Sequence, residues 1–166
     1  MNNKMSAIAL IPARSGSIRL RDKNIRPLQK HPLIAYTISA AQKSGVFDTI
    51  LVSTDSEKYS AIARYYGAET PFLRPPEISG ETSPDIEWVD NTLRQLAEDG
   101  RHFDNFSILR PTSPFRQPET IKKAWQAFTA EKGIDSLRAV ELASQHPGKM
   151  WVVRNERMFP LLPLNP

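Results

Sequence analysis

Residues 7–24 read AIALIPARSGSIRLRDKN, an apolar run followed directly by a loop of small and basic residues. The run at 7–11 is short, uninterrupted and closed by Pro12, which is typical of a strand buried on both faces. Strands of this kind occur in parallel sheets, because helices cover both faces of such sheets. The segment therefore predicts an α/β fold with a polar loop at the carboxyl end of a buried strand.

Helix and strand signals alternate along the rest of the chain. Helices with appropriate Pro, Ser or Gly residues at their ends are predicted at 32–44, 57–66, 85–98 and 118–130. Strands are predicted at 49–52, 70–73 and 106–109, with further strand-like stretches at 136–142 and 151–154. This alternation predicts a mostly parallel sheet with helices on both faces. Such sheets bind ligands beyond the carboxyl ends of their strands, so we expect the site in loops 12–27, 53–56, 74–85 and 110–117.

Length and composition restrict the class of protein. A chain of 166 residues fits one domain, and the absence of cysteine excludes disulfides, thiolate metal sites and a cysteine nucleophile. A cytoplasmic protein without a membrane partner is expected, because no apolar run approaches the roughly 18 residues of a membrane span and the N-terminus lacks a signal-peptide pattern. The net charge of +4 is too small to indicate a nucleic-acid partner.

The loop after the first strand concentrates positive charge. Between positions 14 and 26 it carries one acidic residue, Asp22, and the basic residues Arg14, Arg19, Arg21, Lys23 and Arg26. Ser15 and Ser17 add hydroxyl donors. Because Ser15, Gly16 and Ser17 are all small, a ligand can approach their backbone N–H groups. Such a loop can hold a triphosphate, although the two common glycine-rich phosphate motifs are absent. The alternative is a solvated surface loop without a ligand.

Five segments of the chain carry distinctive motifs. The segments are IPARSGSIRLRDKNI at 11–25, PLIAYTISAA at 32–41, VSTDS at 52–56, FLRPPEISGETSPD at 72–85 and ILRPTSPFR at 108–116. Together they resemble the acylneuraminate cytidylyltransferases. The resemblance extends from about residue 7 to residue 137. It implies a three-layer, Rossmann-like nucleotidyltransferase sheet that is C-terminally incomplete. One domain would span 1–166, with a nucleotide-binding part at about 6–135 and the start of a dimerisation lobe at about 136–166.

The resemblance also implies a reaction. Members of the family transfer CMP from CTP to the anomeric hydroxyl of a nonulosonic (sialic-type) acid, release pyrophosphate and use Mg²⁺. Arg14 and Lys23 match the phosphate-binding cations, and we expect them to be catalytic. The expected substrate-binding residues, taken from the loop chemistry and the resemblance together, are Ser15, Gly16, Ser17, Arg19, Asn24, Arg74, Thr82, Asp85, Arg110, Thr112 and Ser113. The expected partners are CTP, an acidic nine-carbon sugar and a second copy of the chain.

Several of these residues have a structural alternative. Asn24 can cap a turn, Arg74 can end a strand before two prolines, and Asp85 can begin a helix. Asp55 lies between a strand and a helix, and we expect it to cap that helix rather than to bind a metal. The tryptophans, including Trp88, are expected in the core or an interface.

Four features depart from the family pattern. Ile18 stands where a lysine is common, Arg110 replaces a glutamine, and Glu81 and Asp85 replace an aspartate and a small hydroxyl residue. The fourth feature is that the family's Mg²⁺-binding aspartates lie beyond the part that matches, so no metal ligands are expected in residues 1–166. Two alternative functions therefore stay open, a catalytically impaired nucleotide-binding or interaction protein and a sibling nucleotidyltransferase for another sugar.

Overall fold

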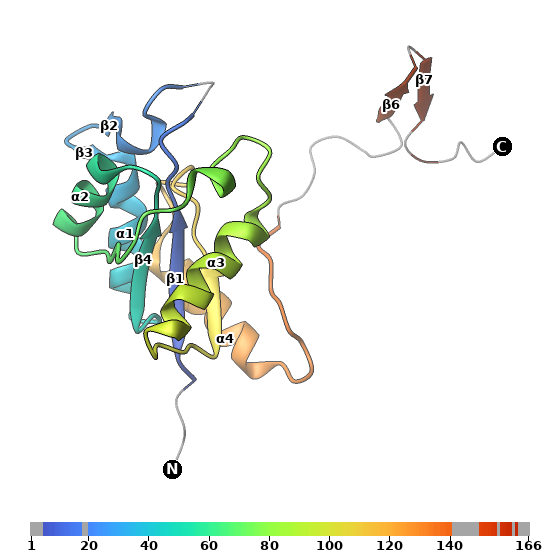
Figure 1. Cartoon of the computed structure of the whole chain (residues 1–166). Helices are drawn as coiled ribbons and strands as arrows, with labels where there is room; N and C mark the ends of the chain where they lie inside the picture. The colour runs from blue at the N-terminus through green and yellow to red at the C-terminus, as the bar shows by residue number, and fades with distance from the viewer. Residues whose placement is uncertain (1–4, 18–19, 141–149, 156, 161, 163–166) are drawn as a thin grey trace. The chain divides into compact units, whose positions relative to one another are not determined.

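The computed structural model describes residues 5–17, 20–140, 150–155, 157–160 and 162. The chain divides into two units, Met1–Lys132 and Gly133–Pro166. The first unit contains a parallel three-stranded sheet in the order β4–β1–β5 (Figure 1). Its strands are β1 (Ala7–Pro12), β4 (Thr49–Ser53) and β5 (Asn105–Ile108). Its helices are α1 (Leu33–Ser44), α2 (Glu57–Tyr65), α3 (Asp85–Glu98) and α4 (Pro118–Ala130).

Side chains of the central strand β1 alternate between two hydrophobic cores. Ala9 and Ile11 are buried together with side chains of α1, α2 and α4. Ile8 and Leu10 are buried on the opposite face together with side chains of α3. Because β1 is covered on both sides, nearly every position in it is apolar. The predicted α/β fold, with a parallel sheet and helices on both faces, is therefore confirmed for this unit.

The strand predicted at 70–73 is wrong. Only Glu69 bridges the sheet, through an isolated parallel bridge to Leu51, and residues 70–75 form no strand. Pro71 has no backbone N–H with which to continue the ladder. The chain instead leaves the sheet and enters an irregular segment, which brings Arg74 back to the end of β4 through a bond from its backbone N–H to the carbonyl of Thr54, at 2.7 Å.

Short elements follow β1 and the irregular segment. They are η1 (Lys23–Ile25), η2 (Pro76–Ile78) and a small antiparallel hairpin of β2 (Pro27–Leu28) and β3 (His31–Pro32). Helix α1 ends at Gly45, whose φ of 63° is the left-handed conformation that glycine adopts without strain.

The regular structure in the described part of the second unit is a β-hairpin. Strand β6 (Trp151–Arg154) pairs antiparallel with β7 (Arg157–Pro160), which confirms the strand predicted at 151–154. The strand predicted at 136–142 is wrong for residues 136–140, which have no regular structure, and its last two residues lie outside the described part. The hairpin exposes Val153, Met158 and Phe159. No helix among the described residues combines the length and apolarity needed to cross a membrane.

Candidate functional site

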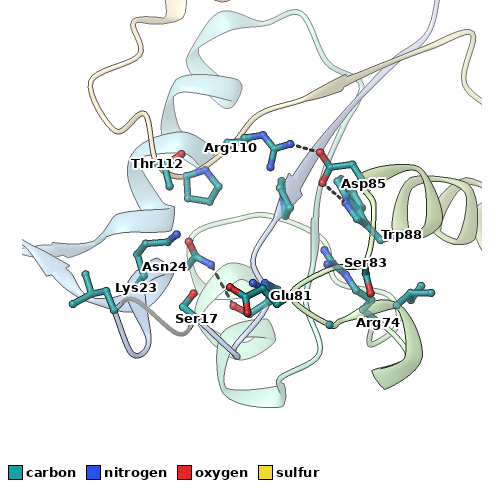
Figure 2. A pocket seen from close by; sticks show the side chains of 16 residues that line it. Ser17, Lys23, Asn24, Arg74, Glu81, Ser83, Asp85, Trp88, Arg110 and Thr112 are labelled. Atoms are coloured by element: carbon teal, nitrogen blue, oxygen red, sulfur yellow. Dashed lines mark hydrogen bonds and ion pairs between the residues drawn. The ribbon is translucent and has the colours of Figure 1, made fainter. Parts of the chain in front are cut away.

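A polar cavity of about 340 Å³ lies beyond the carboxyl ends of β1 and β5 (Figure 2). Its walls come from the loop after β1, the segment that leads into α3 and the turn after β5. The lining residues are Pro12, Arg14, Ser17, Leu20, Lys23, Asn24, Arg74, Ile78, Gly80, Glu81, Ser83, Asp85, Trp88, Arg110, Pro111 and Thr112. The cavity therefore occupies the place where parallel α/β sheets bind ligands.

Most of the residues expected from the sequence come together in this cavity. Those that line it are Arg14, Ser17, Lys23, Asn24, Arg74, Asp85, Arg110 and Thr112. Those that are described but do not line it are Ser15, Gly16, Thr82 and Ser113. Arg19 and its neighbour Ile18 lie outside the described residues.

The charge of the cavity favours an anionic ligand. The lining includes the carboxylates Glu81 and Asp85 and the cations Arg14, Lys23, Arg74 and Arg110. Arg14 donates a long hydrogen bond, 3.4 Å, from Nη1 to the carbonyl of Ser79. The backbone of Lys23 bonds to Leu20 and Arg26, but its ammonium makes no hydrogen bond or ion pair with another described residue. The ammonium is therefore available to a phosphate group.

Asn24 connects the two ends of the basic loop. It is buried, and its Nδ2 donates to the backbone oxygen of Arg14 at 3.4 Å. The residue in the cap position of η1 is Asp22, and no side chain caps that element. Asn24 therefore fastens η1 to the end of β1 and does not act as a cap.

Arg74 is held rigidly beneath the cavity. Its Nε donates to Oγ of Ser53 and its Nη2 to the carbonyl of the same residue, both at 3.0 Å. The guanidinium carbon lies 4.9 Å from the centre of the Trp88 ring, a cation–π contact. Burial disfavours the charged form and lowers the pKa of Arg74 to about 10, so that the side chain is still protonated at neutral pH.

Asp85 connects two walls of the cavity. It is the first residue of α3, and its Oδ1 accepts a hydrogen bond from Nε1 of Trp88 at 3.0 Å. Its Oδ2 accepts a hydrogen bond and ion pair from Arg110, as Figure 2 shows. Asp85 therefore begins a helix and also orients Arg110. Trp88, expected only in a core or an interface, is buried in the α3 core and also lines the cavity.

The prediction that Asp55 caps α2 is wrong. Ser56 occupies the cap position, and no side chain caps the helix. The carboxylate of Asp55 instead accepts hydrogen bonds from the backbone N–H of Ser15 at 2.7 Å and from its Oγ at 2.9 Å. Two hydrogen bonds to the loop after β1 stabilise this carboxylate more than one bond to a helix N–H would.

Sequence reasoning assigned no role to some of the lining residues. The lining residues to which no individual role at the site was assigned are Pro12, Leu20, Ile78, Gly80, Glu81, Ser83, Trp88 and Pro111. For Trp88 a signal was available, because positions three apart on a helix face the same side and Asp85 is three residues before it. The others lie in irregular segments whose direction depends on tertiary contacts.

The described residues do not build a magnesium site. No group of three or more His, Asp or Glu side chains in the described part of the chain is placed to hold a metal ion. The carboxylates that line the cavity are Glu81 and Asp85, and both oxygens of Asp85 already accept bonds from Trp88 and Arg110. Magnesium requires several oxygen ligands in near-octahedral geometry, which these two carboxylates do not supply.

Comparison with known sequences identifies similar proteins. A family model described as cytidylyltransferase matches residues 8–146. The chain is 46% identical over 120 residues to the CMP-N,N'-diacetyllegionaminic acid synthase of Legionella pneumophila, covering 72% of this chain and 52% of that protein. It is 44% identical over 126 residues to the N-acylneuraminate cytidylyltransferase of Escherichia coli, covering 75% of this chain and 29% of that protein. The chain thus spans about half or less of these two relatives.

A third relative and two solved structures extend the comparison. The pseudaminic acid cytidylyltransferase of Campylobacter jejuni is 36% identical over 155 residues, covering 93% of this chain and 67% of that protein. The structure of a CMP:2-keto-3-deoxy-manno-octonic acid synthetase complexed with CTP matches with a TM-score of 0.65 and 17% identity, over 78% of this chain and 49% of that one. A Mycobacterium tuberculosis protein in complex with manganese matches with a TM-score of 0.50 and 15% identity, over 76% of this chain and 61% of that one. The structures support the fold, and the family model and sequence relatives support a plain conclusion: this chain belongs to the cytidylyltransferase family.

Proposed function

We propose that the cavity binds CTP and an acidic nine-carbon sugar, and that the protein transfers CMP to the anomeric hydroxyl of a nonulosonic acid with release of pyrophosphate. The observation that carries this proposal is the meeting of Arg14, Lys23 and Arg74 in one cavity of a cytidylyltransferase-family chain. The relatives named above act, by their names, on legionaminic, neuraminic and pseudaminic acids.

Arg14 and Lys23 are proposed as the catalytic cations at the triphosphate. In an in-line displacement at the α-phosphorus, the sugar hydroxyl attacks and negative charge builds up on the departing pyrophosphate. A guanidinium presents two parallel donors to phosphate oxygens, and an ammonium adds a point charge. Both groups are in place before the reaction, so they stabilise that charge without reorganising. Ser15, Gly16, Ser17 and Arg19 belong to the same proposed phosphate loop.

Arg74 is proposed to bind the cytosine. Two of its nitrogens bind Ser53, and its stacking on Trp88 fixes the plane of the guanidinium. The remaining N–H groups form a fixed donor edge, and the base edge of cytosine offers acceptors to such donors. Asn24 and the nearby segment with Thr82 and Asp85 are proposed to contact the nucleotide as well.

The turn after β5 is proposed to bind the sugar acid. Arg110 lines the cavity beside Thr112, which places a cation next to a hydroxyl. A carboxylate with neighbouring hydroxyls is the pattern of a nonulosonic acid, and a guanidinium binds carboxylates in a bidentate manner. Ser113 is adjacent in the chain and is proposed to contribute from the same turn.

Further properties of the protein are part of the same proposal. A divalent cation, Mg²⁺ by the resemblance, is proposed to accompany the triphosphate. A cytoplasmic location, a homodimer that covers the exposed apolar side chains of the β6–β7 hairpin, and a role in making cell-surface polysaccharide are proposed as well. Residues 6–135 are proposed as the nucleotide-binding part and 136–166 as the start of a dimerisation lobe.

Calorimetry with CTP, UTP and ATP tests the choice of nucleotide. We expect CTP to bind at least tenfold more tightly than the other two, because Arg74 presents fixed donors to the base; equal affinities would overturn the proposal. Pyrophosphate release with neuraminic, legionaminic or pseudaminic acid then tests the transfer. CTP binding without release by any acid would favour the nucleotide-binding alternative.

A further inference from the structure

The loop after β1 is fastened at its beginning by a side chain from another part of the chain. The carboxylate of Asp55, just before α2, accepts bonds from both the backbone N–H and the Oγ of Ser15, at 2.7 and 2.9 Å. Two bonds to one residue fix both its backbone and its side chain. Ser15 is directly followed by Gly16 and Ser17, the small residues of the proposed phosphate loop.

The same loop is fastened a second time near its end. The phenolic O–H of Tyr59, in the first turn of α2, donates to Oδ1 of Asp22 at 3.1 Å. Tyr59 is only 1% exposed, so its ring is fixed by the core. Asp22 has a φ of 55°, a left-handed conformation that is uncommon outside glycine and persists when the surroundings hold it. Lys23, which lines the cavity, comes immediately afterwards.

Burial of the phenol and the neighbouring carboxylate both oppose its ionisation. Desolvation and the hydrogen bond to Asp22 raise the pKa of Tyr59 above its ordinary value. The hydroxyl of Tyr59 is therefore protonated at neutral pH and can donate to Asp22.

Both anchors come from one place in the fold. Asp55 and Tyr59 are four residues apart at the start of α2, and α2 is packed into the core through Tyr59 and Ala63. Neither Asp55 nor Tyr59 lines the cavity, so neither is placed to contact a ligand there. We infer that Asp55 and Tyr59 are positioning residues, which fix Ser15 at the beginning of the loop and Asp22 near its end before a phosphate chain arrives.

The inference rests on the proposed function for the identity of the ligand. A loop that is already ordered loses less conformational entropy on binding, and a loop without its anchors must be ordered at the expense of affinity. Removing an anchor should therefore weaken binding of any ligand that carries the phosphate chain. It should leave the binding of a ligand that lacks phosphates unchanged.

The experiment compares two anchor variants with two matched controls. Tyr59→Phe removes one hydroxyl and keeps the buried ring, and its control is Tyr65→Phe, on the same helix but 84% exposed. Asp55→Asn removes one charge, and its control is Glu57→Gln, whose side chain is 77% exposed. The measurements are the affinities for CTP, inorganic triphosphate and cytidine by calorimetry, and amide hydrogen exchange of residues 15–23.

We expect both anchor variants to bind CTP and inorganic triphosphate about tenfold more weakly, with cytidine affinity unchanged and faster exchange in the loop. The controls should match the wild type in every measurement. Unchanged affinity, or weaker affinity without faster loop exchange, would overturn the inference. Should either variant fail to fold, Ser15→Ala replaces it, because this change deletes the Oγ bond and keeps the N–H bond. We expect it to weaken CTP and triphosphate binding and to speed loop exchange by smaller amounts.

The two proposals fail differently. If the wild type binds neither CTP nor inorganic triphosphate, the proposed function is wrong, and the exchange rates still decide whether Asp55 and Tyr59 hold the loop. If the wild type binds CTP and all variants bind it equally, the function stands and the positioning role is wrong.

Discussion

Asp85 and Arg110 form an ion pair between the first turn of α3 and the turn after β5, although they are 25 positions apart in the chain. Both residues depart from the pattern of the acylneuraminate cytidylyltransferases that the sequence resembles. The structure shows that the two departures are in contact with one another. Trp88 also donates to Asp85, so the carboxylate that holds Arg110 is itself fixed.

Replacing Arg110 tests its role in binding the sugar acid. Arg110→Gln should weaken binding of the acid to CMP-saturated protein about tenfold, because a charge-assisted contact to the carboxylate is lost, and should leave CTP affinity unchanged. Calorimetry measures both. Arg94→Gln is the matched control, since Arg94 pairs with Asp90 on the exposed face of α3. An equal loss of acid affinity in Arg110→Gln and Arg94→Gln would contradict the proposed role of Arg110.

Gly16 gives a test of close approach by the ligand. A Cβ atom added at this position would meet no atom of a non-adjacent described residue within 4 Å, and the backbone does not adopt a positive φ. Gly16→Ala should therefore leave the free energy of unfolding unchanged or raise it by up to about 1 kcal/mol. CTP affinity should nevertheless fall several-fold, because a phosphate that approaches the backbone meets the new methyl group. Urea denaturation and calorimetry measure the two effects; unaltered CTP affinity would place the phosphates elsewhere.

Arg74→Lys tests whether a fixed guanidinium is required. Lysine cannot make the two bonds to Ser53 and the stack on Trp88 at once. The free energy of unfolding should fall by about 2 kcal/mol, the cost of losing hydrogen bonds to a buried charge. The preference for CTP over UTP should fall as well, as measured by calorimetry with both nucleotides. A destabilised variant that retains the full preference would show that Arg74 is structural only.

Acid stability should depend on Asp104. Its carboxylate accepts bonds from the backbone N–H and the Oγ of Ser6, which hold its pKa below the ordinary value of 3.8. A lowered pKa means that the unfolded chain binds the proton more readily, so this stabilisation is present above pH 3.8 and is lost as pH falls further. Asp104→Asn should be less stable at pH 7, and its difference from the wild type should shrink in acid. Thermal melts at several pH values measure this; a constant difference would contradict it.

The main features of the fold could be predicted because the local signals agree with the tertiary structure. The apolar run at 7–11 is a strand buried on both faces, and Gly45 and Pro118 mark a helix end and a helix start as predicted. Pro71 illustrates the opposite case. The residues around Pro71 have strand-like composition, but Pro71 has no backbone N–H with which to pair. Composition alone does not show that a strand at this position would need that N–H.

The site was less predictable, because its contacts join distant segments. Asp55 has the sequence of a cap, yet it bonds to Ser15, 40 residues earlier. Arg74 is held by Ser53 and Trp88, which come from two different elements of the chain. A side chain whose partner lies on another element leaves no pattern in the neighbouring sequence. Sequence patterns therefore predict which loops form the site, but not the hydrogen bonds between those loops.

The walls of the cavity are contributed by segments that reach from Pro12 to Thr112 and thus include chain on both sides of β4. A ligand bound in the cavity contacts segments that move apart when the first unit unfolds. It therefore acts as a reversible cross-link between those segments. At a concentration one hundred times its dissociation constant, a ligand bound there adds about 2.7 kcal/mol to the free energy of unfolding.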